Sequence, residues 1–212
     1  MIQPLNYYGL LAFLSLLTIS CQGQNQTQKT KMVGGGCEGC EALFEYGEKQ
    51  LTPVDTLPDF DQTEPKLKIT GTVYQIDGKT PASGVILYIH HTNRKGIYPQ
   101  KGDEIGWGKR HGYLRGWIQT DASGSYTFYT FRPAAYPDGT EPEHIHLTVK
   151  ESGINAYYLD DFLFADDPGL SPTKVKNLSH RGGNGVVSPV LENGILQVKR
   201  NLILGLNIPD YE

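Results

Sequence analysis

The sequence predicts an all-β fold: a single β-sandwich domain with an irregular N-terminal arm and a loop-rich face that carries the functional site. After residue 65, short runs rich in β-branched and aromatic residues are separated by turn residues, a pattern typical of sandwiches. No long amphipathic helical pattern competes with these runs. The expected strands cover residues 67–75, 85–91, 114–120, 126–131, 144–150, 157–164 and 195–204.

Residues 1–20 are expected to form a signal peptide of the lipoprotein type. The apolar part, residues 9–20, is shorter than the ~20 residues that a membrane-spanning helix needs. Small and apolar residues precede Cys21, and this arrangement resembles a bacterial lipobox in which Cys21 receives the lipid. An ordinary cleaved signal peptide is the alternative. Both predict an extracytoplasmic protein, and the first predicts a lipid anchor on a bacterial membrane, in the periplasm or at the cell surface.

The polar, Gln-rich residues 21–36 are expected to be a flexible tether, and residues 37–65 an arm that lies over the domain rather than in its core. A short helix is expected over residues 41–49. Cys37 and Cys40 predict a local disulfide in an oxidising compartment, with free thiols as the alternative. The β-sandwich domain then occupies residues 66–212.

Two turns punctuate the strands of that domain. Asp77-Gly78-Lys79 follows the first strand, and Asp121-Ala122-Ser123-Gly124 separates the third from the fourth. Asp and Gly favour tight turns, so the strands on either side are expected to pair as hairpins or to lie as near neighbours.

Composition limits the function. With 212 residues, 38% hydrophobic and 20% charged content, the chain suits one globular domain. Its 19 Lys and Arg against 23 Asp and Glu give a net charge of -4, and no basic run is present that would follow a phosphate backbone. Nucleic acid is therefore not an expected partner.

The chemistry is concentrated between residues 132 and 149. His144 and His146 alternate with aliphatic residues, so on a strand both imidazoles leave one face. Tyr136 precedes them in a loop stiffened by Pro133 and Pro137, and Tyr98 is a candidate for a second phenol. Two phenolates and two imidazoles would suit ferric iron, because a trivalent cation favours ionisation of a phenol whose pKa is otherwise about 10. Two polar histidines on the wet side of a sheet are the simpler alternative.

From about residue 66 to 168 the sequence resembles the intradiol ring-cleavage dioxygenases, the family of protocatechuate 3,4-dioxygenase and catechol 1,2-dioxygenase. The resemblance rests on the order of several short motifs. These are Tyr98, Leu114-Arg115-Gly116, Gly124-Ser125-Tyr126, Arg132-Pro133, Tyr136-Pro137, His144-Ile145-His146 and Asp167-Pro168.

The resemblance implies an enzyme that binds non-haem Fe(III) through Tyr98, Tyr136, His144 and His146. Its substrates would be a catecholic small molecule and O2, and its product a muconate-type dicarboxylic acid. Tyr136 matches the tyrosine that leaves the iron and takes up a substrate proton. Two positions depart from the better-known members: Glu141 stands where they carry Arg, and Asp161 lies near the place of a Gln.

Several neighbouring residues receive simpler interpretations. Tyr88 and Tyr113 lie near Tyr98 in the sequence and are alternatives to it as a ligand. His90 and His91 are expected at the surface, because consecutive residues of a strand face opposite ways. The pair Asp160-Asp161 is expected at a solvated strand end.

A second function class remains open at this stage. The strands and turns also suit a non-catalytic β-sandwich module of the prealbumin or carboxypeptidase-regulatory type, and an inactive metal-binding relative is a third possibility. A homodimer is plausible because dimers are the commonest oligomers.

Overall fold

The computed structural model describes residue 1 and residues 30–212. Cys21, most of the expected signal peptide and the first part of the expected tether therefore lie outside the described residues. Within the described part, no helix has the length and apolar character needed to cross a membrane.

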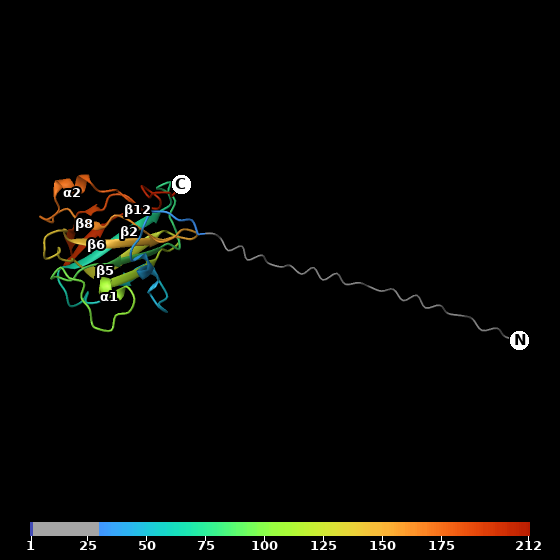
Figure 1. Cartoon of the computed structure of the whole chain (residues 1–212), viewed down its shortest axis with the longest axis horizontal. Helices are drawn as coiled ribbons and strands as arrows, with labels where there is room; N and C mark the ends of the chain where they lie inside the picture. Colours follow the sequence, from blue (N-terminus) through green and yellow to red (C-terminus); the bar gives the residue numbers. More distant parts are fainter. Residues whose placement is uncertain (2–29) are drawn as a thin grey trace.

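Two packed β-sheets form the body (Figure 1). In the first sheet the strands follow the order β1-β5-β2-β11-β10, and β12 pairs with β2. The bounds are β1 Val54–Thr56, β2 Lys66–Tyr74, β5 Ser125–Phe131, β10 Val190–Glu192, β11 Ile195–Lys199 and β12 Leu202–Ile203.

The second sheet has the order β4-β3-β6-β8-β9, with β7 paired to β6. Its bounds are β3 Ile86–His90, β4 Arg115–Gln119, β6 His144–Lys150, β7 Tyr157–Tyr158, β8 Phe162–Phe164 and β9 Val186–Val187. Helical segments are short: η1 (Cys40–Phe44), α1 (Gly108–His111) and α2 (Pro172–Lys176).

The core lies between the sheets and follows the alternation of the strands. In β2, Leu67, Ile69 and Val73 are fully buried, Gly71 continues the buried side, and the alternate residues are partly exposed. Ile145, Leu147 and Val149 of β6 belong to the same buried cluster. Each such side chain contributes roughly 1.5–3 kcal/mol on burial. Two sheets that enclose one core confirm the prediction of an all-β sandwich.

The turns connect strands in a different way from the one expected. β4 pairs with β3 in the second sheet and β5 pairs with β2 in the first, so the 121–124 turn carries the chain from one sheet to the other. The expected hairpin between β4 and β5 is therefore not formed, but the two strands lie close to each other, which was the alternative expectation. Asp121 still makes the predicted turn, since its Oδ1 accepts the backbone N–H of Ser123 and of Ser125.

The arm contributes to the sheets and the core instead of lying over them. β1 pairs in parallel with β5, and Leu57 after it is buried in the main core. Ala42 and Leu43 of η1 are fully buried in a second cluster. The expectation of an arm outside the core was therefore wrong, and the expected helix is a shorter 3-10 turn.

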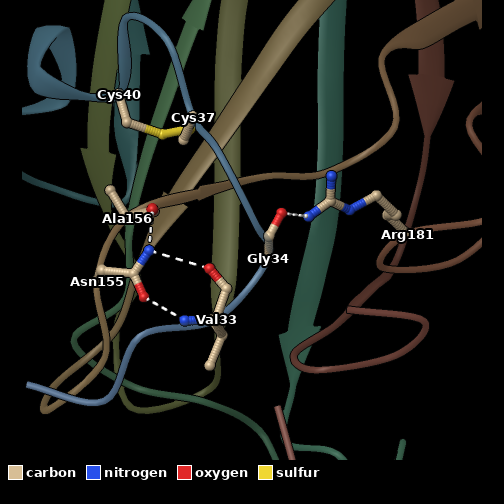
Figure 2. Close-up of a disulfide and its surroundings, with 7 residues drawn as sticks. All are labelled: Val33, Gly34, Cys37, Cys40, Asn155, Ala156 and Arg181. Atoms are coloured by element: carbon tan, nitrogen blue, oxygen red, sulfur yellow. Dashed lines mark hydrogen bonds between the residues drawn. A yellow bond between two sulfur atoms is a disulfide. The ribbon is translucent and has the colours of Figure 1, made fainter. Parts of the chain in front are cut away.

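The first described segment is held by specific hydrogen bonds, shown in Figure 2. The Asn155 side chain accepts the N–H of Val33 at 2.6 Å and donates to its carbonyl at 3.1 Å. Arg181 donates to the carbonyl of Gly34 at 2.8 Å. A disulfide joins Cys37 and Cys40 just beyond. This part of the expected tether is thus packed against the body.

Candidate metal centre and ligand pocket

The two histidines of β6 share one face of the second sheet. Ile145 and Leu147 point into the core, so His144 and His146 leave the opposite face. Their Nε2 atoms lie 3.1 Å apart. The expected placement of both imidazoles on one face is what the structure shows.

Both predicted tyrosines reach the same point. The hydroxyl oxygen of Tyr98 lies 2.7 Å from that of Tyr136 and 2.8 Å from Nε2 of His146. We call these four atoms, Oη of Tyr98, Oη of Tyr136 and Nε2 of His144 and His146, the donor cluster. Tyr88 and Tyr113 lie elsewhere, because their hydroxyls bond to His111 and Asp59.

The loops that carry the tyrosines touch through their backbones. Gly96 has a left-handed φ of 73°, and a Cβ there would come within 2.0 Å of the Ala135 carbonyl oxygen. Only glycine permits both the conformation and this approach. The Thr92 hydroxyl also donates to the Ala134 carbonyl at 2.7 Å. These contacts bring the loop of Tyr98 to the loop of Tyr136.

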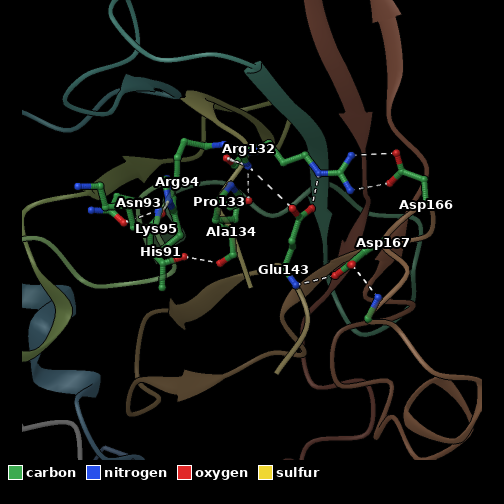
Figure 3. Close-up of polar contacts among 12 residues, drawn as sticks. His91, Asn93, Arg94, Lys95, Arg132, Pro133, Ala134, Glu143, Asp166 and Asp167 are labelled. Carbon is green, nitrogen blue, oxygen red and sulfur yellow. Dashed lines mark hydrogen bonds and ion pairs between the residues drawn. The ribbon is translucent and has the colours of Figure 1, made fainter. Parts of the chain in front are cut away.

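A network of charged residues holds the backbone segments that lead into these loops (Figure 3). Arg94 donates to the carbonyls of Arg132 and Pro133, at 3.0 and 2.8 Å. Arg132 binds Asp166 through two 2.8 Å hydrogen bonds and also pairs with Glu143. Because Glu143 directly precedes His144, the network fixes the start of β6 as well as the tyrosine loop.

The Nδ1 atoms of both histidines are occupied, which leaves both Nε2 atoms for a ligand. Nδ1 of His144 lies 2.7 Å from the Pro142 carbonyl oxygen, and Nδ1 of His146 lies 3.1 Å from a carboxylate oxygen of Asp161. Partners of this kind orient metal-binding histidines. Asp161 was expected at a solvated strand end, whereas the structure places its carboxylate against His146. The one sequence signal for this position was that Asp161 lies near the place of a Gln in the family.

The protonation states of the donor cluster depend on burial and on Asp161. Burial raises the pKa of Tyr98 and of Tyr136, so both phenols stay protonated until a strong positive charge is present. Burial lowers the pKa of His144. Burial also opposes protonation of His146, but Asp161 outweighs it and raises the pKa of that imidazole. Two phenols and two imidazoles form a donor set that suits ferric iron.

The acidic residue at position 141 has a partner. Glu141 forms an ion pair with Lys174 of α2. The position that holds an arginine in better-known relatives is thus occupied by a carboxylate together with a lysine from another element.

A pocket of 490 Å³ opens beside the donor cluster. One side is formed by the arm and the segment around α1, and we call these residues the arm wall: Glu38, Gly39, Trp107, Arg110 and His111. Glu38 pairs with Arg110. A Cβ on Gly39, whose φ is 86°, would lie 2.9 Å from Nε2 of His111, so the disulfide loop rests on this imidazole.

His90 and His91 are buried, 6% and 0% exposed, and the expectation that they lie at the surface was wrong. His91 points into the interior and bonds to Thr130 and to the Thr92 carbonyl. His90 faces the other way, where it lines the pocket together with His111. Consecutive residues at a strand end are expected to face opposite sides of the sheet, but the sequence does not show whether other parts of the chain cover each side.

Comparison with known proteins points to one family. The model of the dioxygenase family matches residues 42–181. The β chain of protocatechuate 3,4-dioxygenase from Burkholderia cepacia is 30% identical over 138 residues, which cover 59% of this chain and 58% of that one. Catechol 1,2-dioxygenase from Candida albicans is 33% identical over 109 residues, which cover 44% and 35%. The chain thus spans between a third and three fifths of the length of these relatives.

Solved structures share the fold. The dioxygenase domain of a dioxygenase and carbohydrate-binding protein fusion from Streptomyces sp. SirexAA-E aligns with a TM-score of 0.55 at 20% identity, covering 80% of this chain and 95% of that one. Catechol 1,2-dioxygenase from Acinetobacter sp. ADP1 aligns with a TM-score of 0.53 at 22% identity, covering 72% and 56%.

Proposed function

The chain belongs to the intradiol dioxygenase family, and on this premise we propose that it is a non-haem Fe(III) enzyme acting on a catecholic aromatic. It breaks the carbon–carbon bond between the two hydroxylated ring carbons. Both atoms of O2 enter the product, a muconate-type dicarboxylic acid, so the reaction is balanced without a further reductant.

The observation that carries this proposal is the convergence of the donor cluster. The hydroxyl of Tyr98 lies within 2.8 Å of both Tyr136 and His146. Tyr98, Tyr136, His144 and His146 are the residues we assign as iron ligands. A non-catalytic sandwich module has no need for two phenols and two imidazoles at one point.

Bound Fe(III) would supply a centre that chelates both catechol oxygens and activates the ring towards O2. The protein residues manage protons and position. With the metal bound, the Tyr136 phenol would be ionised, and its Oη would take up a proton from a substrate hydroxyl as the substrate enters. The Tyr98 hydroxyl lies within hydrogen-bond distance of this oxygen. Asp161 holds Nδ1 of His146, so that its Nε2 stays directed at the donor cluster. The pocket beside the cluster receives the ring.

The test is a visible absorption spectrum of the iron-loaded protein, recorded before and after addition of catechol under nitrogen. We expect a tyrosinate-to-iron charge-transfer band that shifts when catechol binds. Admission of ¹⁸O2 should then yield a dicarboxylic acid with two labelled oxygens. A colourless protein that retains no iron would refute the proposal, and a labelled aldehyde product would place the cleavage outside the catechol diol.

We also propose that the protein is extracytoplasmic and anchored by a lipid on Cys21. The apolar segment before Cys21 and the adjacent polar stretch support this placement, as does the disulfide between Cys37 and Cys40, since disulfides persist in oxidising compartments. Labelled palmitate should appear in the full chain and be absent from the Cys21→Ala variant. Equal labelling of both would refute the anchor at Cys21.

A further inference from the structure

His90 is a pocket residue whose role the proposed iron chemistry does not use. It pairs with His146 across β3 and β6, so the two side chains stand next to each other on the same sheet face. The side chain of His90 is among those that line the pocket. It therefore lies beside a proposed ligand without belonging to the donor cluster.

The ring of His90 is held on both faces. It stacks on His146 with a centroid distance of 4.5 Å, and on His111 with 3.9 Å and an interplanar angle of 8°. His111 is itself fixed, because its Nδ1 lies 2.8 Å from the Tyr88 hydroxyl. The imidazole of His90 cannot turn aside without breaking one of these stacks, so its edge has a set position in the pocket.

Nδ1 of His90 is buried and has no hydrogen-bond partner among residues 30–212. This is unusual, since roughly 90% or more of buried polar groups are hydrogen-bonded. The neighbouring histidines differ in this respect: both ring nitrogens of His91 have partners, and so does Nδ1 of His144. Because Nδ1 is closed off from solvent, a ligand in the pocket can reach only the other ring nitrogen, Nε2, which forms no hydrogen bond within residues 30–212. With neither nitrogen engaged by the protein, Nε2 can carry the ring proton or accept one from a ligand.

We propose, on the basis of the proposed function, that His90 is a specificity-determining residue that hydrogen-bonds a third hydroxyl on the ring of the bound catechol. The two chelating oxygens are engaged at the donor cluster. His90 lies against the ring of His146 and lines the pocket, so Nε2 at the tip of its side chain is the atom placed to meet a substituent next to those oxygens. A neutral imidazole can both donate and accept, which suits a hydroxyl and leaves an alkyl group unpaired. The site therefore favours a trihydroxybenzene over catechol.

The experiment compares catechol with pyrogallol, which is 1,2,3-trihydroxybenzene. Dissociation constants are read under nitrogen from the charge-transfer band, which avoids oxidation of the free phenols, and kcat/KM is read in air. We expect the wild-type protein to bind pyrogallol about tenfold more tightly than catechol, as one additional hydrogen bond allows. Equal or weaker binding of pyrogallol would overturn the proposal without any variant.

Variants locate the preference. His90→Phe keeps the stacking surface but removes both ring nitrogens, and should bring the pyrogallol-to-catechol ratio close to one. His90→Gln restores a donor and an acceptor, and it should recover part of the preference for pyrogallol. Tyr88→Phe is the matched control, because it keeps the ring that stacks on His90 and removes a hydroxyl that bonds to His111, and it should keep the wild-type ratio. A ratio unchanged in His90→Phe would refute the role of His90.

Failure of this inference is separable from failure of the proposed function. A wild-type protein that binds iron and cleaves catechol, but shows no preference for pyrogallol, refutes only the role of His90. A protein without iron and without a charge-transfer band refutes the dioxygenase proposal itself, and the inference with it.

Discussion

The donor cluster and the arm wall face one pocket, but different interactions hold them. Behind the donor cluster stands the network of Arg132, whose side chain is 13% exposed and bonds to Glu143 and Asp166. The ion pair of the arm wall, Arg110 with Glu38, has side chains that are 63% and 72% exposed. Hydrogen bonds between charged groups in a partly buried network contribute about 1.5–3 kcal/mol each, whereas exposed ion pairs contribute about 0–1 kcal/mol. The ion pairs next to the donor cluster should therefore contribute more to stability than the ion pair of the arm wall.

The largest expected effect separates a tyrosine of the donor cluster from one outside it. Tyr98→Phe should lower iron content and turnover by more than about a hundredfold, since loss of a supporting residue alone costs 10–100-fold in metal sites. Tyr113→Phe is the control, because that hydroxyl bonds to Asp59 outside the cluster. Metal analysis and steady-state kinetics measure both, and equal loss in the two variants would remove Tyr98 from the assigned ligands.

The next effect compares the two arginines directly. Arg132→Met leaves Glu143 without its main partner and should lower the free energy of unfolding by about 3 kcal/mol, since hydrogen bonds to charged groups contribute about 1.5–3 kcal/mol each. Arg110→Met breaks an exposed pair and should change it by less than about 1 kcal/mol. Urea denaturation of each variant gives both values. If the two losses were similar, the expected difference between these two sets of ion pairs would be wrong.

A pH effect tests the burial of His91, which follows β3 and points into the interior. Burial lowers the pKa of His91 to about 4, below its unfolded value of about 6.5. The neutral imidazole therefore contributes fully above pH ~6.5, and this contribution, about 3 kcal/mol, is lost as the pH falls towards 4. His91→Gln keeps a polar side chain without titrating, and its unfolding free energy should fall less steeply over this interval. Parallel pH profiles would contradict the assignment.

The smallest effect concerns the disulfide below the arm wall. Cys37→Ser with Cys40→Ser opens a short loop and should lower the free energy of unfolding by about 2 kcal/mol in the loop-entropy view. The iron charge-transfer band should persist, while the KM for catechol should rise, because Gly39 rests on His111. Thermal unfolding, the visible spectrum and kinetics measure the three quantities. Loss of iron in this variant would show that the donor cluster depends on the arm wall.

Much of the fold was predictable because it follows local rules. The alternation of His144-Ile145-His146-Leu147 specifies which side chains enter the core, and the structure places them so. The pairing of strands was not predictable in the same way. A turn such as the one at Asp121 can connect two strands of the same sheet or one strand of each sheet. Its local sequence is the same in both cases, and only the packing of the sheets determines which one forms. The three residues of β1 are too few to show any period.

The donor set was predictable from the order of motifs in the family, whereas its surroundings were not. Asp161, in the link between β7 and β8, meets His146 of β6, and His90 of β3 is covered by His111 of α1. Such contacts leave no spacing in the sequence. They also make the departures from the family interpretable, since Glu141 is seen to pair with Lys174 only in three dimensions.

The bridge between Lys31 and Ile154 has a practical consequence for attaching the protein to a support. The N–H of Gly34 donates to the carbonyl of Pro209, so the first described segment and the last one lie together. Ile154 follows the end of β6, and His144 begins that strand, about 20 Å away at ~3.3 Å per residue. Immobilisation through either end of this body should therefore leave the donor cluster remote from the support and open to diffusing phenols.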